Sequence, residues 1–165
     1  MRIVNANLTD LSEIIEIYSG ARAFMKEAGN PNQWGGAYPA KELIISDIES
    51  EKLYLVKDDM GDTLAVFYYS YGKDPTYEKI YEGKWQSAEP YGVIHRIAVS
   101  DKARGRGVSA FCFEEMLKKS SRLRIDTHKD NLPMQRALAK FGFSYAGIIY
   151  IESGAERLAY EIEMK

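Results

Sequence analysis

The chain has 165 residues, of which 45% are hydrophobic and 28% charged, as is ordinary for a soluble globular protein. This composition excludes collagen and disordered chains, and no apolar run approaches the roughly 18 residues of a bilayer span. We therefore expect one domain over residues 1–165, with one sizeable core. The start lacks the long apolar run of a signal peptide, and a single cysteine cannot form an internal disulfide. The sequence thus predicts a cytoplasmic protein without a membrane partner.

The charge is unevenly distributed along the chain. The formal net charge is −2, which argues against a nucleic-acid partner. Residues 101–143 hold ten Lys or Arg and five Asp or Glu, so this segment carries +5 and the rest of the chain −7. A basic segment in an acidic protein predicts a local anionic ligand, although two solvated helix faces would give the same charges.

The first half of the chain predicts two helices and three strands. A cap at Thr9 or Asp10 begins a helix whose apolar residues recur at helical spacing, and a stretch rich in Gly and Pro ends it. The turn at 58–62 is typical of a hairpin. The expected elements are a strand at 2–7, a helix from 11, a loop at 29–39, a helix at 41–50, and strands at 53–57 and 63–71.

The second half alternates between strands and helices, after a polar and aromatic segment at 73–90 that has no clear assignment. Gly142 predicts the end of a helix, and Gly154 predicts a turn between the last two strands. The expected elements are strands at 91–99, 123–125, 143–151 and 158–162, and helices at 108–119 and 132–141. The order predicts an α+β fold in which helices interrupt a mixed sheet.

A glycine-rich loop between the strand at 91–99 and the next helix carries the clearest chemical signal. It has the sequence Arg104-Gly105-Arg106-Gly107-Val108-Ser109. Its glycines allow backbone N–H groups to converge, and the positive end of the helix dipole favours an anion, most often a phosphate. The simpler alternative is a surface turn with glycines for conformation and arginines for solubility.

Two phosphate-binding families compete for this loop. Gly105-x-Gly107-x-x-Ala110 matches the dinucleotide fingerprint, and Asp126 lies 21 residues after the first glycine, near the expected ribose-binding acid. However, five residues separate Val99 from the first glycine, and only 60 residues follow it, too few for a doubly wound sheet. A nicotinamide-dependent oxidoreductase is therefore the less favoured alternative.

The second family is the GNAT family of N-acetyltransferases. The loop resembles its Arg/Gln-x-x-Gly-x-Gly/Ala signature, with Ser109 in the last position, and the block at 125–135 with Gly142-Phe143 is similar to the family's asparagine-containing segment and closing Gly-Phe pair. The resemblance implies the layered α/β/α GNAT fold, with about six to seven strands in a mixed central sheet and helices on both faces. It also implies an acetyl-CoA-dependent N-acetyltransferase that acts on a primary amine of a small molecule or peptide. Homodimers are common in the family.

The resemblance assigns acetyl-CoA to the glycine-rich loop and the strand before it. The pyrophosphate would lie on the N–H groups of the loop, and the pantetheine would pair with the strand edge. Asn131 would hydrogen-bond the pantetheine, and it also suits the cap of the helix at 132–141. The expected cofactor-binding residues are Ile97, Ala98, Val99, Arg104, Gly105, Arg106, Gly107, Val108, Ser109 and Asn131.

The catalytic candidates are two histidines and a tyrosine. His95 is the first candidate for the general base, because it lies on the motif strand and an imidazole with a pKa of ~6.5 suits a base at neutral pH; a structural histidine is the alternative. His128 is the second candidate. Leu138 stands where many relatives carry a tyrosine acid, so either the thiolate leaves unassisted or another group, such as Tyr145, protonates it. An acyl-CoA-binding module without catalysis is a further alternative.

The acceptor site is expected between the first two helices and the sheet. Aromatic rings offer faces for a cation, although core packing accounts for the same rings. The −7 charge outside 101–143 favours a basic amine. The expected substrate-binding residues are Trp34, Tyr38, Glu89 and Tyr91, no metal site is assigned, and Cys112 is expected in the core.

Overall fold

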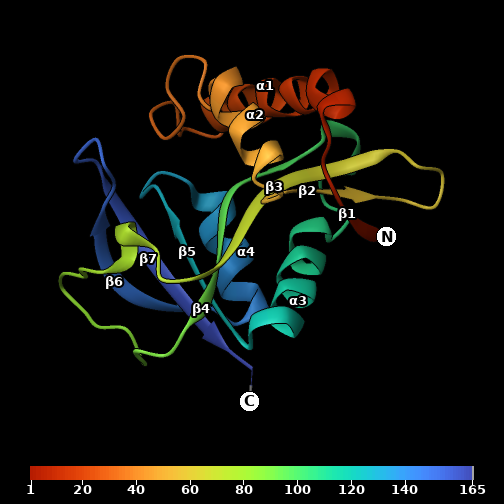
Figure 1. Cartoon of the computed structure of the whole chain (residues 1–165). Helices are drawn as coiled ribbons and strands as arrows, with labels where there is room; N and C mark the ends of the chain where they lie inside the picture. The colour runs from red at the N-terminus through yellow and green to blue at the C-terminus, as the bar shows by residue number, and fades with distance from the viewer. Residues whose placement is uncertain (165) are drawn as a thin grey trace.

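A mixed sheet organises the chain (Figure 1). The computed structural model describes residues 1–164, and within them seven strands form one sheet in the order β1-β2-β3-β4-β5-β7-β6. Neighbouring strands are antiparallel, apart from the parallel pair β4 and β5. The strands are β1 (Arg2–Asn5), β2 (Leu53–Lys57), β3 (Thr63–Gly72), β4 (Tyr91–Val99), β5 (Arg122–Thr127), β6 (Ser144–Tyr150) and β7 (Glu156–Glu163). This topology confirms the predicted mixed sheet and does not suit the doubly wound parallel sheet of the dinucleotide interpretation.

Helices cover both faces of the sheet, as Figure 1 shows. Pairs α1–α2 and α3–α4 pack on opposite faces, so the layered α+β fold is confirmed. The α-helices are α1 (Leu11–Glu27), α2 (Lys41–Glu49), α3 (Val108–Ser120) and α4 (Leu132–Phe141). The short 3-10 turns are η1 (Leu8–Asp10), η2 (Pro75–Tyr77) and η3 (Asp101–Ala103). Gly142 ends α4 in a left-handed conformation, as predicted.

Two cores follow from the alternation of side chains along the central strands. Leu55 and Val66 pack with α1 and α2, whereas the adjacent Val56 and Phe67 pack on the other face with α3 and α4. Cys112 lies fully buried in the second core, and burial raises the pKa of its thiol to about 12. The thiol therefore remains protonated at neutral pH, in line with the predicted packing role.

The first helix begins at Leu11, as predicted, but the capping hydrogen bonds come from a different residue. Asn7, rather than Thr9 or Asp10, provides the cap: its Oδ1 accepts from the Thr9 N–H at 3.0 Å, and Asp10 Oδ2 accepts in return from the Asn7 N–H at 3.0 Å. Asp10 does stand at the N-cap position of α1, but its side chain makes no capping bond to that helix. The reciprocal box lies one turn earlier because η1 precedes the α-helix.

Residues 73–90, which the sequence left unassigned, cover the part of the sheet that α1 and α2 leave open. Tyr77 is 1% exposed and packs with Tyr91 and Val93 of β4 on the face opposite to Ile94, which belongs to the α3–α4 core. The segment contains η2 and one isolated bridge, between Tyr81 and Ile148. Side-chain contacts rather than a repeating backbone pattern hold it, so it carries no periodic signal in the sequence.

A buried ion pair anchors this segment to the sheet. Arg124 Nε lies 2.7 Å from Glu161 Oε2, and the two side chains are 4% and 1% exposed. The guanidinium also donates to the Ser87 carbonyl at 2.7 Å, and its carbon lies 4.0 Å from the ring centroid of Trp85 and 3.8 Å from that of Tyr91. The pair therefore fixes the course of residues 85–87 over β5.

Replacing Glu161 with glutamine should lower the free energy of unfolding by about 3–5 kcal/mol, because the Arg124 guanidinium would stay buried without a counter-charge. Urea denaturation measures the change. The matched control is Glu115→Gln in the exposed pair with Lys118, whose atoms lie 2.6 Å apart, and it should leave the midpoint unchanged. Equal effects of the two substitutions would show that the buried pair does not anchor the fold.

Candidate active site

The candidate site is a cleft that opens where β4 and β5 separate. Within the described residues their parallel register joins Gly92 with Leu123 and Val93 with Arg124 and goes no further. From Ile94 onward, the edge of β4 that faces β5 therefore has no strand partner. Residues 97–99, the predicted pantetheine-binding strand, lie on this open stretch.

The cleft has a volume of ≈ 650 Å³, enough for part of a cofactor and a small acceptor. The two diverging strands supply its side walls, and the α1–α2 loop, the β6–β7 turn and the start of α4 supply much of the rest. Figure 1 shows this loop and this turn projecting on the same side of the sheet. The polar and aromatic lining residues include Gln33, Trp34, Tyr38, His95, Arg96, Asp126, Asn131 and Arg157.

A β-bulge in β4 shapes the cleft wall. Tyr68 of β3 pairs with His95 and Val66 pairs with Ala98, so β4 has one extra residue here, and Arg96 adopts a left-handed φ of +51°. The Arg96 carbonyl accepts from the Tyr18 hydroxyl at 3.1 Å, and its guanidinium lies 2.6 Å from Asp47 Oδ2. The bulge thus ties the middle of β4 to α1 and α2.

The glycine-rich loop has the geometry expected of an anion site. Gly105 and Gly107 have φ of +77° and +76°, and no heavy atom lies within 4 Å of a Cβ built on either. Gly107 is the N-cap of α3 without a side-chain cap, so the first-turn N–H groups, including those of Val108 and Ser109, lack helical partners. The residues of the predicted phosphate site therefore do fit an anion at this helix terminus.

The two arginines of the loop differ in their surroundings. Arg104 turns towards α1: its Nη2 lies 2.5 Å from Asp101 Oδ1 and donates to the Gly20 carbonyl at 3.2 Å, and its guanidinium carbon lies 4.2 Å from the Phe24 ring centroid. Arg106 is exposed. The side chain of Arg104 therefore fixes the loop, and Arg106 is the arginine whose charge faces solvent beside it.

Asn131 is the N-cap of α4 and also joins two walls of the cleft. Its Oδ1 accepts from the Met134 N–H at 3.2 Å, and its Nδ2 donates to Gln33 Oε1 at 2.8 Å. The same Gln33 oxygen accepts from Asn30 Nδ2 at 2.8 Å. Asn131 therefore caps α4, as the sequence suggested, and its contact with pantetheine remains a prediction.

His95 lies between two carboxylates in the cleft. Its Nε2 is 2.9 Å from Asp74 Oδ2, and its Nδ1 is 3.7 Å from Asp126 Oδ1. Burial alone raises the pKa of Asp74, but the hydrogen bond and charge of His95 and bonds from Thr76 outweigh burial and lower it. Since ionised Asp74 can only accept, Nε2 carries the proton, and in the neutral ring Nδ1 presents its lone pair on the side of Asp126.

Asp126 connects His95 with two further side chains. The Tyr77 hydroxyl donates to Asp126 Oδ1 at 2.7 Å, and Arg157 Nε lies 4.0 Å from Oδ2. Burial, followed by the charge of Asp126, raises the pKa of Tyr77 well above its usual range, so its hydroxyl stays protonated and donates. The carboxylate is thus oriented from one side and keeps an oxygen towards the cleft.

The structure does not bring the other two catalytic candidates into the cleft. His128 Nδ1 accepts from the Asp130 N–H at 3.1 Å in the turn before α4, and burial and the charge of Arg157 lower its pKa. Tyr145 on β6 is 52% exposed, and its ring packs at 5.8 Å on Tyr160, which belongs to the α3–α4 core. Neither residue lines the cleft.

Only two of the four predicted acceptor-binding residues line the cleft. Trp34 and Tyr38 line the cleft, with ring centroids 6.3 Å apart. Tyr91 is buried, and its hydroxyl accepts from the Asp74 N–H at 3.1 Å, so it holds the partner of His95 from behind. Glu89 is exposed in the 73–90 segment, outside the cleft lining.

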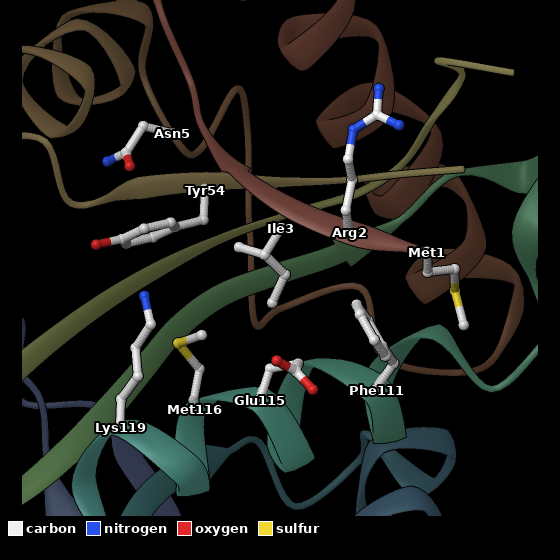
Figure 2. Close-up of a pocket in the computed structure, with 9 residues that line it drawn as sticks. All are labelled: Met1, Arg2, Ile3, Asn5, Tyr54, Phe111, Glu115, Met116 and Lys119. Atoms are coloured by element: carbon white, nitrogen blue, oxygen red, sulfur yellow. The ribbon is translucent and has the colours of Figure 1, made fainter. Parts of the chain in front are cut away.

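A second, shallower cavity of ≈ 380 Å³ lies away from this chemistry, between β1, β2 and α3. Figure 2 shows Ile3 and Tyr54 on its strand side and Phe111, Met116 and Lys119 rising from α3. The Lys119 ammonium lies 5.1 Å from the Tyr54 ring centroid. Its lining contains no histidine or cysteine, so the cleft is the candidate active site.

Comparison with known proteins agrees with this geometry. The model of the acetyltransferase (GNAT) family matches residues 22–143. The chain belongs to the GNAT family. A GNAT-family acetyltransferase from Streptococcus agalactiae is 32% identical, with a TM-score of 0.89, over 99% of this chain and 95% of that one.

More distant solved structures share the GNAT fold. A phosphinothricin acetyltransferase from Sinorhizobium meliloti in complex with acetyl-CoA is 13% identical, with a TM-score of 0.65, over 99% of this chain and 88% of that one. A ribosomal-protein-alanine N-acetyltransferase from Brucella melitensis is 15% identical, with a TM-score of 0.67, over 99% and 100%. A search of curated proteins finds no match. No helix within residues 1–164 combines the length and hydrophobicity needed to cross a membrane.

Sequence reasoning missed three residues that this GNAT cleft brings together with His95. Asp74 lies in the unassigned segment, and Arg157 lies just before the expected strand at 158–162, although β7 in fact begins at Glu156. Asp126 entered only as a ribose-binding acid. The Asp74-Pro75 pair, with Asp74 Oδ1 accepting from the Thr76 N–H at 2.8 Å, was a readable start signal for η2, but it does not indicate contact with a histidine.

The ion pair of Asp74 with His95 predicts a specific acid sensitivity. A carboxyl whose pKa is lowered by folding stabilises the native state above its unfolded pKa, and this contribution is lost as pH falls through the folded value. Wild-type protein should therefore lose more stability than Asp74→Asn between about pH 5 and pH 2. Urea denaturation across this range measures both. The control Asp59→Asn, at an exposed carboxylate, should keep the wild-type loss; the same loss in Asp74→Asn would argue against the pair in solution.

Proposed function

We propose that this GNAT protein is an acetyl-CoA-dependent N-acetyltransferase that acetylates a primary amine, with His95 as the general base. The observation that carries the proposal is the position of His95 Nδ1 in the cleft, 3.7 Å from Asp126 Oδ1. An ammonium placed at Asp126 would be held by its carboxylate and would lie beside the lone pair of Nδ1.

The residues of the chain fit acetyl-CoA at two places. The first-turn N–H groups of α3 after Gly107, with their dipole, suit the pyrophosphate. The unpartnered edge of β4 at residues 97–99 suits an amide-rich chain that pairs as a strand. The cofactor supplies a thioester, to which the amine forms a C–N bond while the C–S bond breaks and CoA leaves as the thiol.

Within the cleft the chain moves one proton and holds the acceptor. His95 accepts a proton from the ammonium at Nδ1, while Asp74 and Asp126 on either side of the ring stabilise the positive charge that it gains. The ring is 20% exposed, so the proton can pass from it to water. The second N–H proton of the amine leaves with the thiol, and Leu138, fully buried in the core, has no part in this step.

The leading acceptors are a small-molecule amine and a peptide N-terminus. Enzymes of both kinds share this fold, namely the phosphinothricin acetyltransferase and the ribosomal-protein-alanine N-acetyltransferase named above. A second candidate function is an acyl-CoA-binding module without catalysis, which Leu138 in place of a tyrosine acid favours. Thiol release from acetyl-CoA with a panel of amines separates the two.

CoA affinity should depend on the charge at the start of α3. Gly107 has φ of +76°, which asparagine and aspartate tolerate similarly, so Gly107→Asn and Gly107→Asp differ essentially in charge. Calorimetric titration should show CoA binding at least tenfold weaker in the aspartate variant, because its carboxylate would face phosphate. NAD should not bind the wild type. Equal CoA affinity in the two variants would place the phosphates elsewhere.

His95 should matter for turnover rather than for cofactor binding. His95→Ala should lower kcat/KM for the acceptor by ~10²-fold, because it removes the proton acceptor. The Kd for CoA should stay within a few-fold, since strand pairing uses backbone groups that the variant retains. The thiol-release assay measures turnover. His128→Ala is the matched control and should retain activity; the opposite ranking would move the base to His128.

A further inference from the structure

Two guanidinium groups line the cleft, and they are neutralised to different extents. Arg96 Nη2 lies 2.6 Å from Asp47 Oδ2. Arg157 has its nearest carboxylate oxygen, Asp126 Oδ2, at 4.0 Å, although its side chain is 7% exposed. Its two Nη groups donate to the backbone carbonyls of Glu156 at 2.9 Å and Gln33 at 3.3 Å. Within residues 1–164, the buried Arg157 cation therefore has only neutral carbonyl groups in close contact, and no carboxylate within hydrogen-bond distance.

The pKa values of the two arginines shift in opposite directions, in line with this difference. Burial alone would lower the pKa of Arg96, but the Asp47 carboxylate outweighs burial and raises it. Burial also lowers the pKa of Arg157, and there the distant Asp126 does not restore it. A buried charge with incomplete compensation is costly, and an anion bound beside it relieves that cost.

The position of Arg157 indicates which ligand would carry the anionic group that pairs with it. Arg157 lies near the β6–β7 turn and contacts Gln33 in the α1–α2 loop, whereas residues 104–109 of the glycine-rich loop are not part of the cleft lining. The anion is therefore separate from the phosphates assigned to that loop. Glu152, the other acidic residue of the lining besides Asp126, is exposed and solvated.

Asp126 sets the spacing between the two ends of the acceptor. Its Oδ1 lies 3.7 Å from His95 Nδ1, and its Oδ2 lies 4.0 Å from Arg157 Nε. An amine held at Asp126 for deprotonation by His95 thus has the guanidinium of Arg157 near the other oxygen of the same carboxylate. An α-amino acid carries its ammonium and its carboxylate on the same carbon, so one small acceptor presents both charges to the groups around Asp126.

We propose that the acceptor is a free α-amino acid or a close analogue, whose carboxylate pairs with Arg157 while its amine lies at Asp126 and His95. This inference rests on the proposed acetyl transfer and deepens it. An arginine presents two parallel N–H donors to a carboxylate, and Arg157 can do so by exchanging its backbone carbonyl contacts. The N-terminus of a peptide has an amide in place of that carboxylate and would leave Arg157 uncompensated.

The test compares each amino acid with its carboxamide, in which a neutral group replaces the carboxylate. The thiol-release assay with wild-type enzyme should give a kcat/KM at least tenfold higher for the preferred amino acid than for its amide. Arg157→Gln should abolish that preference mainly through KM for the amino acid, so that the acid and its amide are acetylated with similar kcat/KM. Arg157→Lys should recover part of the preference, and Arg136→Gln, at an exposed arginine on α4, should leave it intact.

The possible results separate this proposal from acetyl transfer itself. If the wild type acetylates amines but does not prefer the acid, or if Arg157→Gln lowers both acceptors equally, the carboxylate site is refuted and the transferase stands. If no amine is acetylated, calorimetric titration of the amino acids into the CoA-loaded protein decides. Binding that Arg157→Gln weakens at least tenfold supports the site, and absence of binding overturns it. Thermal melting of each variant shows that the fold is retained.

Discussion

The parting of β4 from β5 is the constraint on which the site depends. Two parallel register pairs join the strands, and beyond Val93 and Arg124 their facing edges diverge. Backbone N–H and C=O groups inside a protein need hydrogen-bond partners. The open edge of β4 therefore suits an extended ligand that pairs with it as a strand would. The same divergence leaves His95 of β4 and Asp126 of β5 facing one cleft, with Nδ1 3.7 Å from Oδ1. The bulge at Arg96 and its bond to Tyr18 hold β4 in this course.

A chain of side-chain contacts that starts at the buried pair Arg124–Glu161 positions the polar groups of the cleft. Glu161 holds Arg124, Arg124 holds the segment around Trp85 and Ser87, and Trp85 Nε1 donates to the Tyr77 carbonyl at 2.9 Å. Tyr77 then orients Asp126 through its hydroxyl. The Arg124–Glu161 link is buried and the other links are partly buried, and polar contacts shielded from water in this way are costly when left unpaired. The order of the site is therefore coupled to the stability of the 73–90 segment, which carries Asp74 as well.

The sequence predicted what short-range patterns specify. The glycine-rich loop and α3, the capped α4 and most strand bounds follow from spacing, and His95 was identified because it lies on the motif strand. Its environment could not be predicted, because Asp74 lies 21 residues earlier in a segment without periodicity. Arg157 and Gln33 are 124 residues apart and meet only when β7 and the α1–α2 loop close on the same cleft. Side-chain contacts over such separations leave no pattern in a single sequence.

The lack of a tyrosine at position 138 is consistent with how charge is distributed here. Leu138 is fully buried against the core, so restoring a hydroxyl there would place a polar group among apolar neighbours. The cleft instead concentrates its polar groups around His95, with Asp74 and Asp126 beside the ring and Arg157 next to Asp126. A thiol has a pKa of ~8.5, so its thiolate is a good leaving group without a positioned acid, whereas an alkylammonium with a pKa of ~10.4 must lose a proton before it can attack. In the proposed acetyl transfer, deprotonation of the amine is thus the step for which this chain provides its positioned groups.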